Sequence, residues 1–248
     1  MVGVEAASRY TVQVLLPRMV ELEADAVHYR LCAWQDGVQL VRGGDRLSFA
    51  IPTADLPLLV SIFQAPPEAF AGPLNDALVW TPAWNERWDD LAERCRASVV
   101  IAMTAQRPIN HASKLLAFLA VLDTVLGMLP DRDRDAAVLH WLPAQQLMTF
   151  ERYRSLRIEL GPCGPAVNIR IANATGRPGE LLADTVGLAD LGLPDLQVVF
   201  TDRDPAEVRD QLQHLVRAIF VGDRLECTWI EEAALVPPER DALTLLEC

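Results

Sequence analysis

Hydrophobic and polar residues alternate in several short segments of the chain, which is the pattern of half-buried β-strands. Residues 10–16 alternate in this way and are followed by Pro17, so we predict a first strand there. The segments 38–41 and 46–51 flank two glycines and predict a hairpin. Further strands are predicted over residues 58–63, 98–104, 137–142, 166–171, 196–200, 225–229 and 244–246.

Between these segments, apolar residues recur at a spacing of three and four, as on the buried face of a helix. The helix predicted over residues 204–221 has the clearest ends, because Asp204 suits the N-cap and Pro205 the first turn. Gly222 suits its C-terminal end. Other helices are predicted over residues 20–31, 81–95, 110–128 and 145–154.

The chain is organised around the segment 56–104, which contains three of the six tryptophans. Thr81 is predicted to cap a helix that has Pro82 in its first turn. Trp80 precedes the cap, where it fits equally well a contact that holds the helix start and a residue of a protein interface. The apolar stripe of this helix consists of Trp84, Trp88, Leu91 and Cys95.

These elements predict an α/β (α+β) fold with a mixed β-sheet, helices layered on it, and strand–helix–strand units in both halves. Residues 1–248 are enough for a single globular domain with a full core. Pro130 and the charged run 131–135 predict an exposed connection, which would divide the domain into two closely packed halves, 1–130 and 131–248.

The negative charge of the chain is explained most simply by solubility, and among binding partners it favours a basic protein. With 34 acidic against 22 basic side chains, the net charge of −12 disfavours nucleic acid and anionic membranes and suits a basic protein. The N-terminus shows no export signal, and the most apolar stretch, 115–129, contains Asp123 and is too short to span a bilayer. The five cysteines lack CxxC spacing, which favours reduced thiols. We therefore expect a cytoplasmic protein.

The motifs of common catalytic and cofactor sites do not occur in this sequence. It has no G-x-S-x-G, G-x-x-x-x-G-K or G-x-G-x-x-G, and no cysteines or histidines are paired at metal-ligand spacing. Asp131, Asp133 and Asp135 imitate the start of a calcium loop, but Ala136 and Leu142 replace the glycine and glutamate that such a loop requires. We predict no catalytic, cofactor-binding or metal-binding residues.

Single residues that could carry chemistry each have a simpler structural interpretation. His140 beside Trp141 could present a base at a strand end, but a buried structural histidine is favoured, and His214 is expected at the rim of a buried helix face. Cys163 has no basic neighbour in sequence that would lower the pKa of its thiol, so we interpret it as an ordinary loop cysteine. The arginines around Tyr153 favour a solvated helix end over RNA contact; they are Arg152, Arg154 and Arg157.

The order of several short motifs resembles the bacterial domain-of-unknown-function family 4261. The motifs are VSIFQAPP at 60–67, WTPAW at 80–84, the strand 99–103, VLHW at 138–141, TVGL at 185–188 and VGD at 221–223. The likeness covers most of residues 56–235, but Cys95-Arg96 stands where such proteins tend to carry a histidine. The resemblance implies a bacterial accessory protein, sometimes accompanying secreted toxin systems, and a binding role.

We therefore expect a non-enzymatic, protein-binding accessory protein of bacteria. It would be an immunity protein, or an adaptor or chaperone, for a secreted, type VI-like toxin or effector. Two alternatives stay open. One is an enzyme of an unrecognised class whose site is built from scattered residues such as His140, Asp184 and Glu231. The other is a structural subunit of a bacterial assembly.

Overall fold

A seven-stranded antiparallel sheet is the largest unit of the protein, in the order β2-β3-β4-β5-β1-β6-β7. The computed structural model describes residues 8–43, 46–53, 57–81, 84, 87–105, 110–174, 178–222 and 243–244. The strands of this sheet are β1 (Ser8–Leu16), β2 (Gln39–Gly43), β3 (Arg46–Ile51), β4 (Leu58–Ala65), β5 (Ala97–Ala105), β6 (Val138–Trp141) and β7 (Gln146–Thr149).

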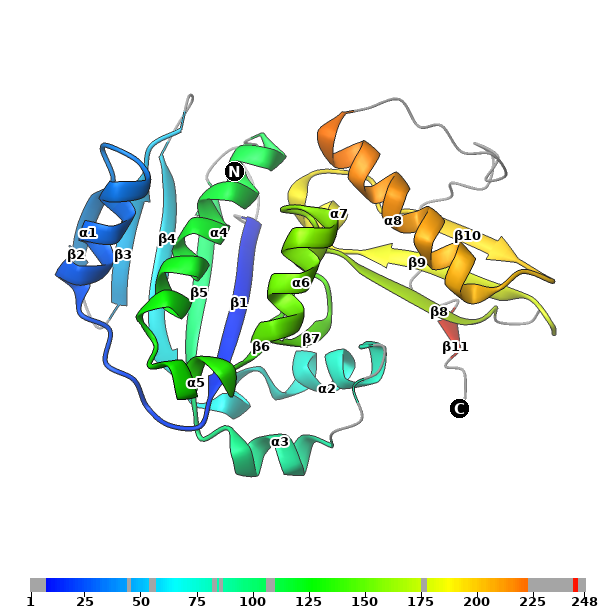
Figure 1. Cartoon of the computed structure of the whole chain (residues 1–248), viewed down its shortest axis with the longest axis horizontal. Coiled ribbons are helices and arrows are strands. Elements are labelled where there is room, and N and C mark those ends of the chain that lie inside the picture. Colours follow the sequence, from blue (N-terminus) through cyan, green and yellow to red (C-terminus); the bar gives the residue numbers. More distant parts are fainter. Residues whose placement is uncertain are drawn as a thin grey trace, which may run out of the picture.

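A smaller antiparallel sheet lies beside the first, next to its β7 end (Figure 1). It consists of β8 (Asn168–Ala174), β9 (Leu181–Val186) and β10 (Gln197–Phe200), with β11 (Leu243–Thr244) paired to β8. The prediction of an α+β fold with helices layered on sheet is confirmed. The prediction of a mixed sheet is wrong, since the described strand pairs are all antiparallel.

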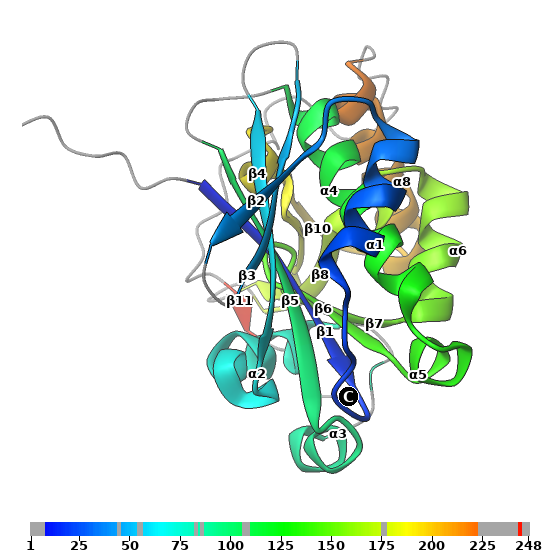
Figure 2. The ribbon, with the colours of Figure 1, turned by 90° about the vertical axis from the view of Figure 1, so that its left-hand side faces the viewer.

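Four longer helices cover one side of the two sheets, on the right in Figure 2. They are α1 (Ala24–Trp34), α4 (His111–Met128), α6 (Phe150–Leu160) and α8 (Pro205–Val221). Helices α2 (Ala71–Trp80) and α3 (Trp88–Arg94) pack against the opposite face of the large sheet, where Leu74 and Leu91 contact Leu15 and Val138 in a small apolar cluster. The short helices are α5 (Asp131–Asp135), α7 (Leu188–Leu191), and the 3-10 helices η1 (Pro67–Phe70) and η2 (Gly164–Ala166).

One continuous apolar core joins the two sheets to the four long helices. Its centre is an aromatic cluster of Tyr10, Phe118, Trp141 and Tyr153, in which neighbouring ring centroids lie 5.0–6.4 Å apart. Trp141 is fully buried, and its indole Nε1 donates a hydrogen bond to the Tyr10 hydroxyl at 3.0 Å. The strongly apolar α4 is sandwiched between this cluster and α1, as its composition predicts.

Helix α4 has 18 residues and is, within the described part of the chain, the one helix long and apolar enough to cross a membrane. Half of it is buried inside the protein, and the core helix of a soluble protein passes the same test of length and composition. It contains most of residues 115–129, the apolar stretch that we predicted to be too short to span a bilayer. Its N-cap, Asn110, accepts hydrogen bonds from the backbone of Ala112 and Ser113, so the predicted start of this helix is confirmed.

Two predicted helices are wrong at their starts. Thr81 does not cap a following helix but ends α2, where its hydroxyl donates to the Ala77 carbonyl at 2.6 Å. The next described helix begins only at Trp88. The helix predicted over residues 145–154 is divided, because residues 146–149 pair with β6 as strand β7 and Thr149 then caps α6. The strand predicted over 225–229 lies outside the described residues.

The charged run after Pro130 is largely exposed, as predicted, but it is a short helix and not an irregular connection. It forms α5, and Asp133 is buried, with Arg18 Nε and Nη2 donating to its carboxylate at 2.8–3.2 Å. Strands β6 and β7 follow this run, yet they complete the large sheet beside β1. The large sheet therefore takes strands from both sides of the predicted boundary between 130 and 131.

Candidate functional site

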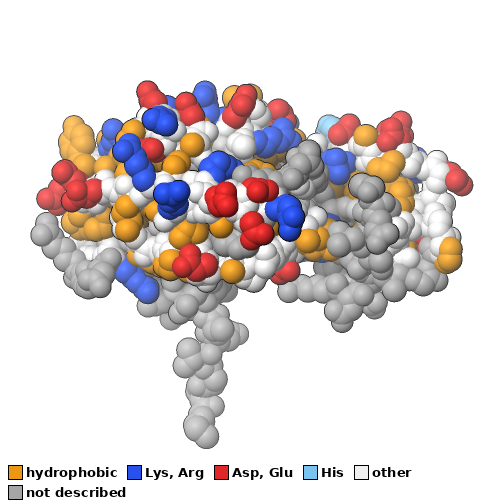
Figure 3. All heavy atoms as spheres, turned by 90° about the horizontal axis from the view of Figure 1, so that it is seen from below, with side chains coloured by type: hydrophobic (Ala, Val, Ile, Leu, Met, Phe, Trp, Pro, Cys, Tyr) orange, Lys and Arg blue, Asp and Glu red, His pale blue; other side chains and the backbone are white. Residues whose placement is uncertain are grey.

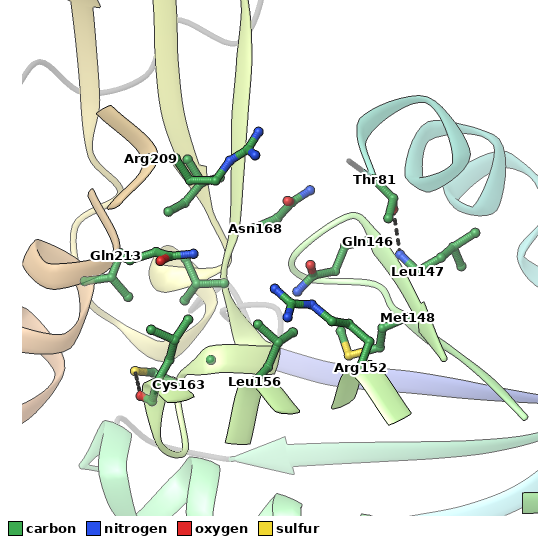
Figure 4. Close-up of a pocket in the computed structure, with 15 residues that line it drawn as sticks. Thr81, Gln146, Leu147, Met148, Arg152, Leu156, Cys163, Asn168, Arg209 and Gln213 are labelled. Atoms are coloured by element: carbon green, nitrogen blue, oxygen red, sulfur yellow. Dashed lines mark hydrogen bonds between the residues drawn. The ribbon is translucent and has the colours of Figure 1, made fainter. Parts of the chain in front are cut away.

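A cavity of about 140 Å³ lies where the two sheets meet, between α6 and α8 (Figure 4). Strand β7 of the large sheet and strand β8 of the small sheet line its base, and η2 and the end of α2 close its sides. The cavity therefore exists only because four separate parts of the chain converge. Sites between packed units are common places for ligands in proteins.

The polar side chains of the cavity wall are either basic or uncharged. Arg152 comes from α6 and Arg209 from the facing helix α8. In Figure 4 the Arg152 guanidinium points toward the middle of the labelled residues, and the Arg209 guanidinium lies at their upper edge, beyond Asn168. Side-chain amides also line the cavity, and none of its described lining residues is acidic. The amide residues are Gln146, Asn168 and Gln213.

Hydrogen bonds hold two of these amides in place. Gln146 Nε2 donates to the Pro165 carbonyl at 2.9 Å, and Asn168 Nδ2 donates to the Trp80 carbonyl at 3.1 Å. By contrast, Arg209 Nε is buried and has no hydrogen-bond partner among the described residues. Arg152 has one described ion pair, 3.5 Å from Glu159, and both side chains are about half exposed. Arg209 Nε is thus the buried polar atom of the cavity wall that has no described partner.

The remaining wall is apolar. It includes leucine, valine and isoleucine side chains from α6, β8 and α8, and Cys163. Cys163 lies in the loop after α6, and its thiol is buried and donates to the Leu160 carbonyl at 3.4 Å. Burial raises the pKa of this thiol, which keeps it protonated at neutral pH. The lining residues therefore suit binding of an amphiphilic anion better than nucleophilic catalysis.

His140 is fully buried on the large sheet beneath η1 and α2. Its Nδ1 lies 3.3 Å from Gln13 Oε1, and Gln13 Nε2 donates in turn to the Pro67 carbonyl at 3.0 Å. Burial lowers the pKa of His140 to about 4, and the nearby Pro73 carbonyl opposes this shift only in part. The ring is therefore neutral at pH 7 and belongs to the core, in agreement with the favoured structural interpretation.

We expect His140 to make the protein sensitive to acid. Its pKa is lower in the folded than in the unfolded chain, so its contribution to stability is present above pH 6.5 and is lost as pH falls toward 4. The amount is about 3 kcal/mol. Urea unfolding of the wild type and of His140→Gln between pH 7 and pH 4 should show a steeper loss for the wild type.

His214 provides the control. It is exposed, and its one described side-chain hydrogen bond is to the Asp210 carbonyl. His214→Gln should leave the pH dependence unchanged. An imidazole of His140 that titrates near pH 6.5 by NMR would contradict the assignment of this histidine to the core.

Asp184, the second residue of the scattered-residue hypothesis, forms a buried ion pair on the small sheet. Arg170 Nε donates to Asp184 Oδ1 at 2.9 Å and Arg170 Nη2 to Oδ2, and the guanidinium lies 4.8 Å from the ring centroid of Trp80. Burial raises the pKa of Asp184, and Arg170 opposes the rise. No described contact joins Asp184 to His140, and Glu231 lies outside the described residues. Trp80, which the Arg170 guanidinium contacts, is the half-buried last residue of α2.

The other two histidines and the arginines near Tyr153 have structural partners. His28 and His111 bind the backbone carbonyls of Val38 and Phe220 at 2.9 and 2.7 Å. Arg157 donates to Asp123 and to the Tyr153 hydroxyl, so it does not act together with Arg152. His214 is exposed, not at the rim of a buried face. Within the described ranges, no group of three or more His, Cys, Asp or Glu side chains could hold a metal ion.

A groove of about 620 Å³ runs over the outer side of α4, between α1 and α6. Trp34 of α1 and Leu116 of α4 line it, and each side chain is 46% exposed. Arg30, Asp123 and Arg157 provide polar groups along it, and Arg30 Nη1 donates to the Gly127 carbonyl at 3.2 Å. We call this feature the α4 groove.

No family model, no curated protein and no solved structure matches the chain. The resemblance to family 4261 therefore stays a prediction. No motif in the sequence indicates the cavity, because Arg152 is predicted only as part of a solvated helix end, and Arg209 and Asn168 occupy ordinary polar positions. The fold brings these residues to one cavity, which has α6 and α8 on its two sides.

Proposed function

We propose that this chain is a cytoplasmic, non-enzymatic accessory protein of bacteria that binds another protein through the α4 groove. The partner would be a basic toxin or secreted effector, and the chain would act as its immunity protein, or as its adaptor or chaperone. The observation that carries the proposal is the half-exposed pair Trp34 and Leu116 in the groove.

The composition of the groove and its flanks supports a protein ligand. Tryptophan, tyrosine and arginine are the residue types that contribute most to binding at protein interfaces. The flanking helices also carry Tyr29 on α1, 77% exposed, and Ile158 on α6, 80% exposed, although neither lines the groove. Isolated apolar residues on a surface are ordinary, whereas Trp34 and Leu116 line one groove together, which is typical of a contact surface.

Charge supports the choice of a basic partner. The net charge of −12 would attract such a protein at long range and would raise the association rate more than the final affinity. In the view of Figure 3, acidic and basic side chains are interspersed with apolar ones. We therefore expect the charge of the whole protein to raise the association rate and the apolar residues of the groove to provide the affinity.

The test is to identify the partner by co-purification from the native host and then to measure its affinity for variants. We expect Trp34→Ala and Leu116→Ala to weaken binding at least tenfold each, because truncating a buried interface anchor costs about 1.5–4 kcal/mol. Val79→Ala on α2, where Val79 is 50% exposed, removes a comparable exposed side chain elsewhere and should bind like the wild type.

A salt series separates the two contributions. We expect the association rate to fall as ionic strength rises, while the effects of Trp34→Ala and Leu116→Ala persist at high salt. Equal affinity of these two variants and the wild type would refute the groove as the binding surface. Recovery of the chain as a fixed component of a large assembly would favour the structural-subunit alternative.

A further inference from the structure

We propose that the cavity between α6 and α8 binds a small organic carboxylate with a short apolar chain, held by Arg152 and Arg209. This ligand site is separate from the α4 groove, since the two share no lining residue. It does not depend on the protein-binding function proposed above.

The charge of the cavity is the first reason. The chain as a whole has 34 acidic and 22 basic side chains, so a random set of lining residues would include more acids than bases. Among the described residues, the cavity wall has two arginines and no acid. A basic cavity in an acidic protein concentrates small anions against the overall charge, because nearby charges in a partly buried site act more strongly than distant screened ones.

The unsatisfied Arg209 is the second reason. Its Nε is buried without a hydrogen-bond partner among the described residues, although buried polar atoms in folded proteins almost always have one. A carboxylate oxygen within the cavity would provide the missing acceptor. Two other donors of the wall, Gln146 Nε2 and Asn168 Nδ2, already bind backbone carbonyls, so the arginines and the Gln213 amide are the groups left to bind a ligand.

The nature of the two basic residues indicates an oxyanion. The planar guanidinium presents paired N–H donors that match the two oxygens of a carboxylate. Arg152 and Arg209 come from different helices, so a carboxylate that binds both would connect α6 to α8. Arg152 is half exposed and only loosely paired with Glu159, so it can turn toward the ligand at little cost.

The apolar wall and the volume indicate the rest of the ligand. Leu156, Val167 and Val216 belong to an aliphatic surface that would contact a hydrocarbon chain and would leave a fully hydrated ion such as phosphate poorly matched. A cavity of about 140 Å³ is close to the size that holds a benzene molecule in an engineered protein core. A carboxylate with about five or six carbons therefore fits.

The experiment is isothermal titration calorimetry of the full chain with three probes. These are 4-methylpentanoate, its neutral analogue 4-methylpentanamide, and inorganic phosphate. We expect saturable binding of one carboxylate per chain with a Kd on the order of 1 mM or tighter, as its few heavy atoms allow. The amide and phosphate should bind at least tenfold more weakly, because one lacks the charge and the other lacks the apolar chain.

Variants connect this binding to the cavity. Arg209→Gln and Arg152→Gln should each weaken binding of 4-methylpentanoate at least tenfold, whereas Arg209→Lys should lose less because it keeps the charge. Arg154→Gln is the matched control, since Arg154 is exposed on the same helix as Arg152 and does not line the cavity. Circular dichroism and thermal unfolding of each variant establish that it is folded.

Each other outcome overturns the proposal. Absence of saturable binding at 10 mM carboxylate would exclude the ligand class. Equal affinity for the carboxylate and the amide would exclude a role for the arginines. Phosphate bound more tightly than the carboxylate would show that the apolar wall is not used, and equal losses in Arg154→Gln and Arg209→Gln would show non-specific attraction to arginine.

Discussion

Replacement of Arg170 by methionine is expected to lower the free energy of unfolding by about 3–5 kcal/mol at pH 7. Arg170 and Asp184 are 8% and 1% exposed, and the guanidinium forms a two-pronged ion pair with the carboxylate. Arg170 Nη1 also donates to Gln145 Oε1 at 3.1 Å, and the guanidinium stacks on Trp80. Methionine fills similar volume but leaves the Asp184 carboxylate buried without a countercharge.

The pH dependence distinguishes this mechanism from a general loss of packing. Burial raises the pKa of Asp184, and Arg170 is the group that opposes this rise, so its removal raises the pKa further. A carboxyl whose pKa is higher in the folded state stabilises that state below its unfolded pKa and loses this contribution as pH rises through the folded pKa. The deficit of Arg170→Met should therefore be largest at neutral pH and shrink toward pH 4.

A double variant completes the test. Arg170→Met with Asp184→Leu removes both charges and should recover most of the lost stability, because a buried ion pair contributes little over well-packed apolar residues. Urea unfolding followed by circular dichroism measures all three proteins. If Arg170→Met is as stable as the wild type, or if the double variant is the least stable of the three, the buried carboxylate is not the cause.

Trp141→Ala is expected to cost about 3–5 kcal/mol of unfolding free energy, the usual range for a large aromatic residue removed from a core. Trp141 contacts three aromatic rings, and its ring lies 6.2 Å from Tyr10 and 5.9 Å from Phe118. Its loss also deprives the buried Tyr10 hydroxyl of the indole donor. This hydroxyl stays protonated, because burial strongly raises the pKa of Tyr10.

Trp141→Phe is the matched comparison, since phenylalanine keeps an aromatic ring but not the hydrogen bond. We expect it to lose about 1–2 kcal/mol. Chemical unfolding monitored by circular dichroism avoids the change in fluorescence that removal of a tryptophan causes. A loss below about 1 kcal/mol for the alanine variant would mean that the aromatic cluster is not the centre of the core.

Elements with regular periodicity and local end signals could be predicted from the sequence. The ends of α8 depend on Asp204, whose side chain accepts from the Ala206 backbone, and on Gly222 with a positive φ of 76°. Both signals act within one helical turn, so no knowledge of the rest of the fold is required. The same is true of Asn110 at the start of α4.

Elements whose limits depend on distant residues could not be predicted. A threonine hydroxyl can serve either end of a helix, and Thr81 serves the end of α2 because the Leu147 backbone, far along the chain, donates to it at 2.7 Å. Residues 146–149 form a strand because β6 lies beside them. The cavity is a similar case, since Arg152 and Arg209 line the same cavity only after the two sheets have packed together.

Strand β1 occupies the interior of the large sheet, between β5 and β6. Its residues pair with partners as remote in sequence as Ala105 and Trp141, so the sheet has a high contact order. Because β1 precedes both of its neighbours in the chain, it is flanked on both sides only after β6 has been synthesised, and a chain that ended at residue 130 would present an open β1 edge suited to intermolecular pairing. The large sheet is therefore completed late in synthesis.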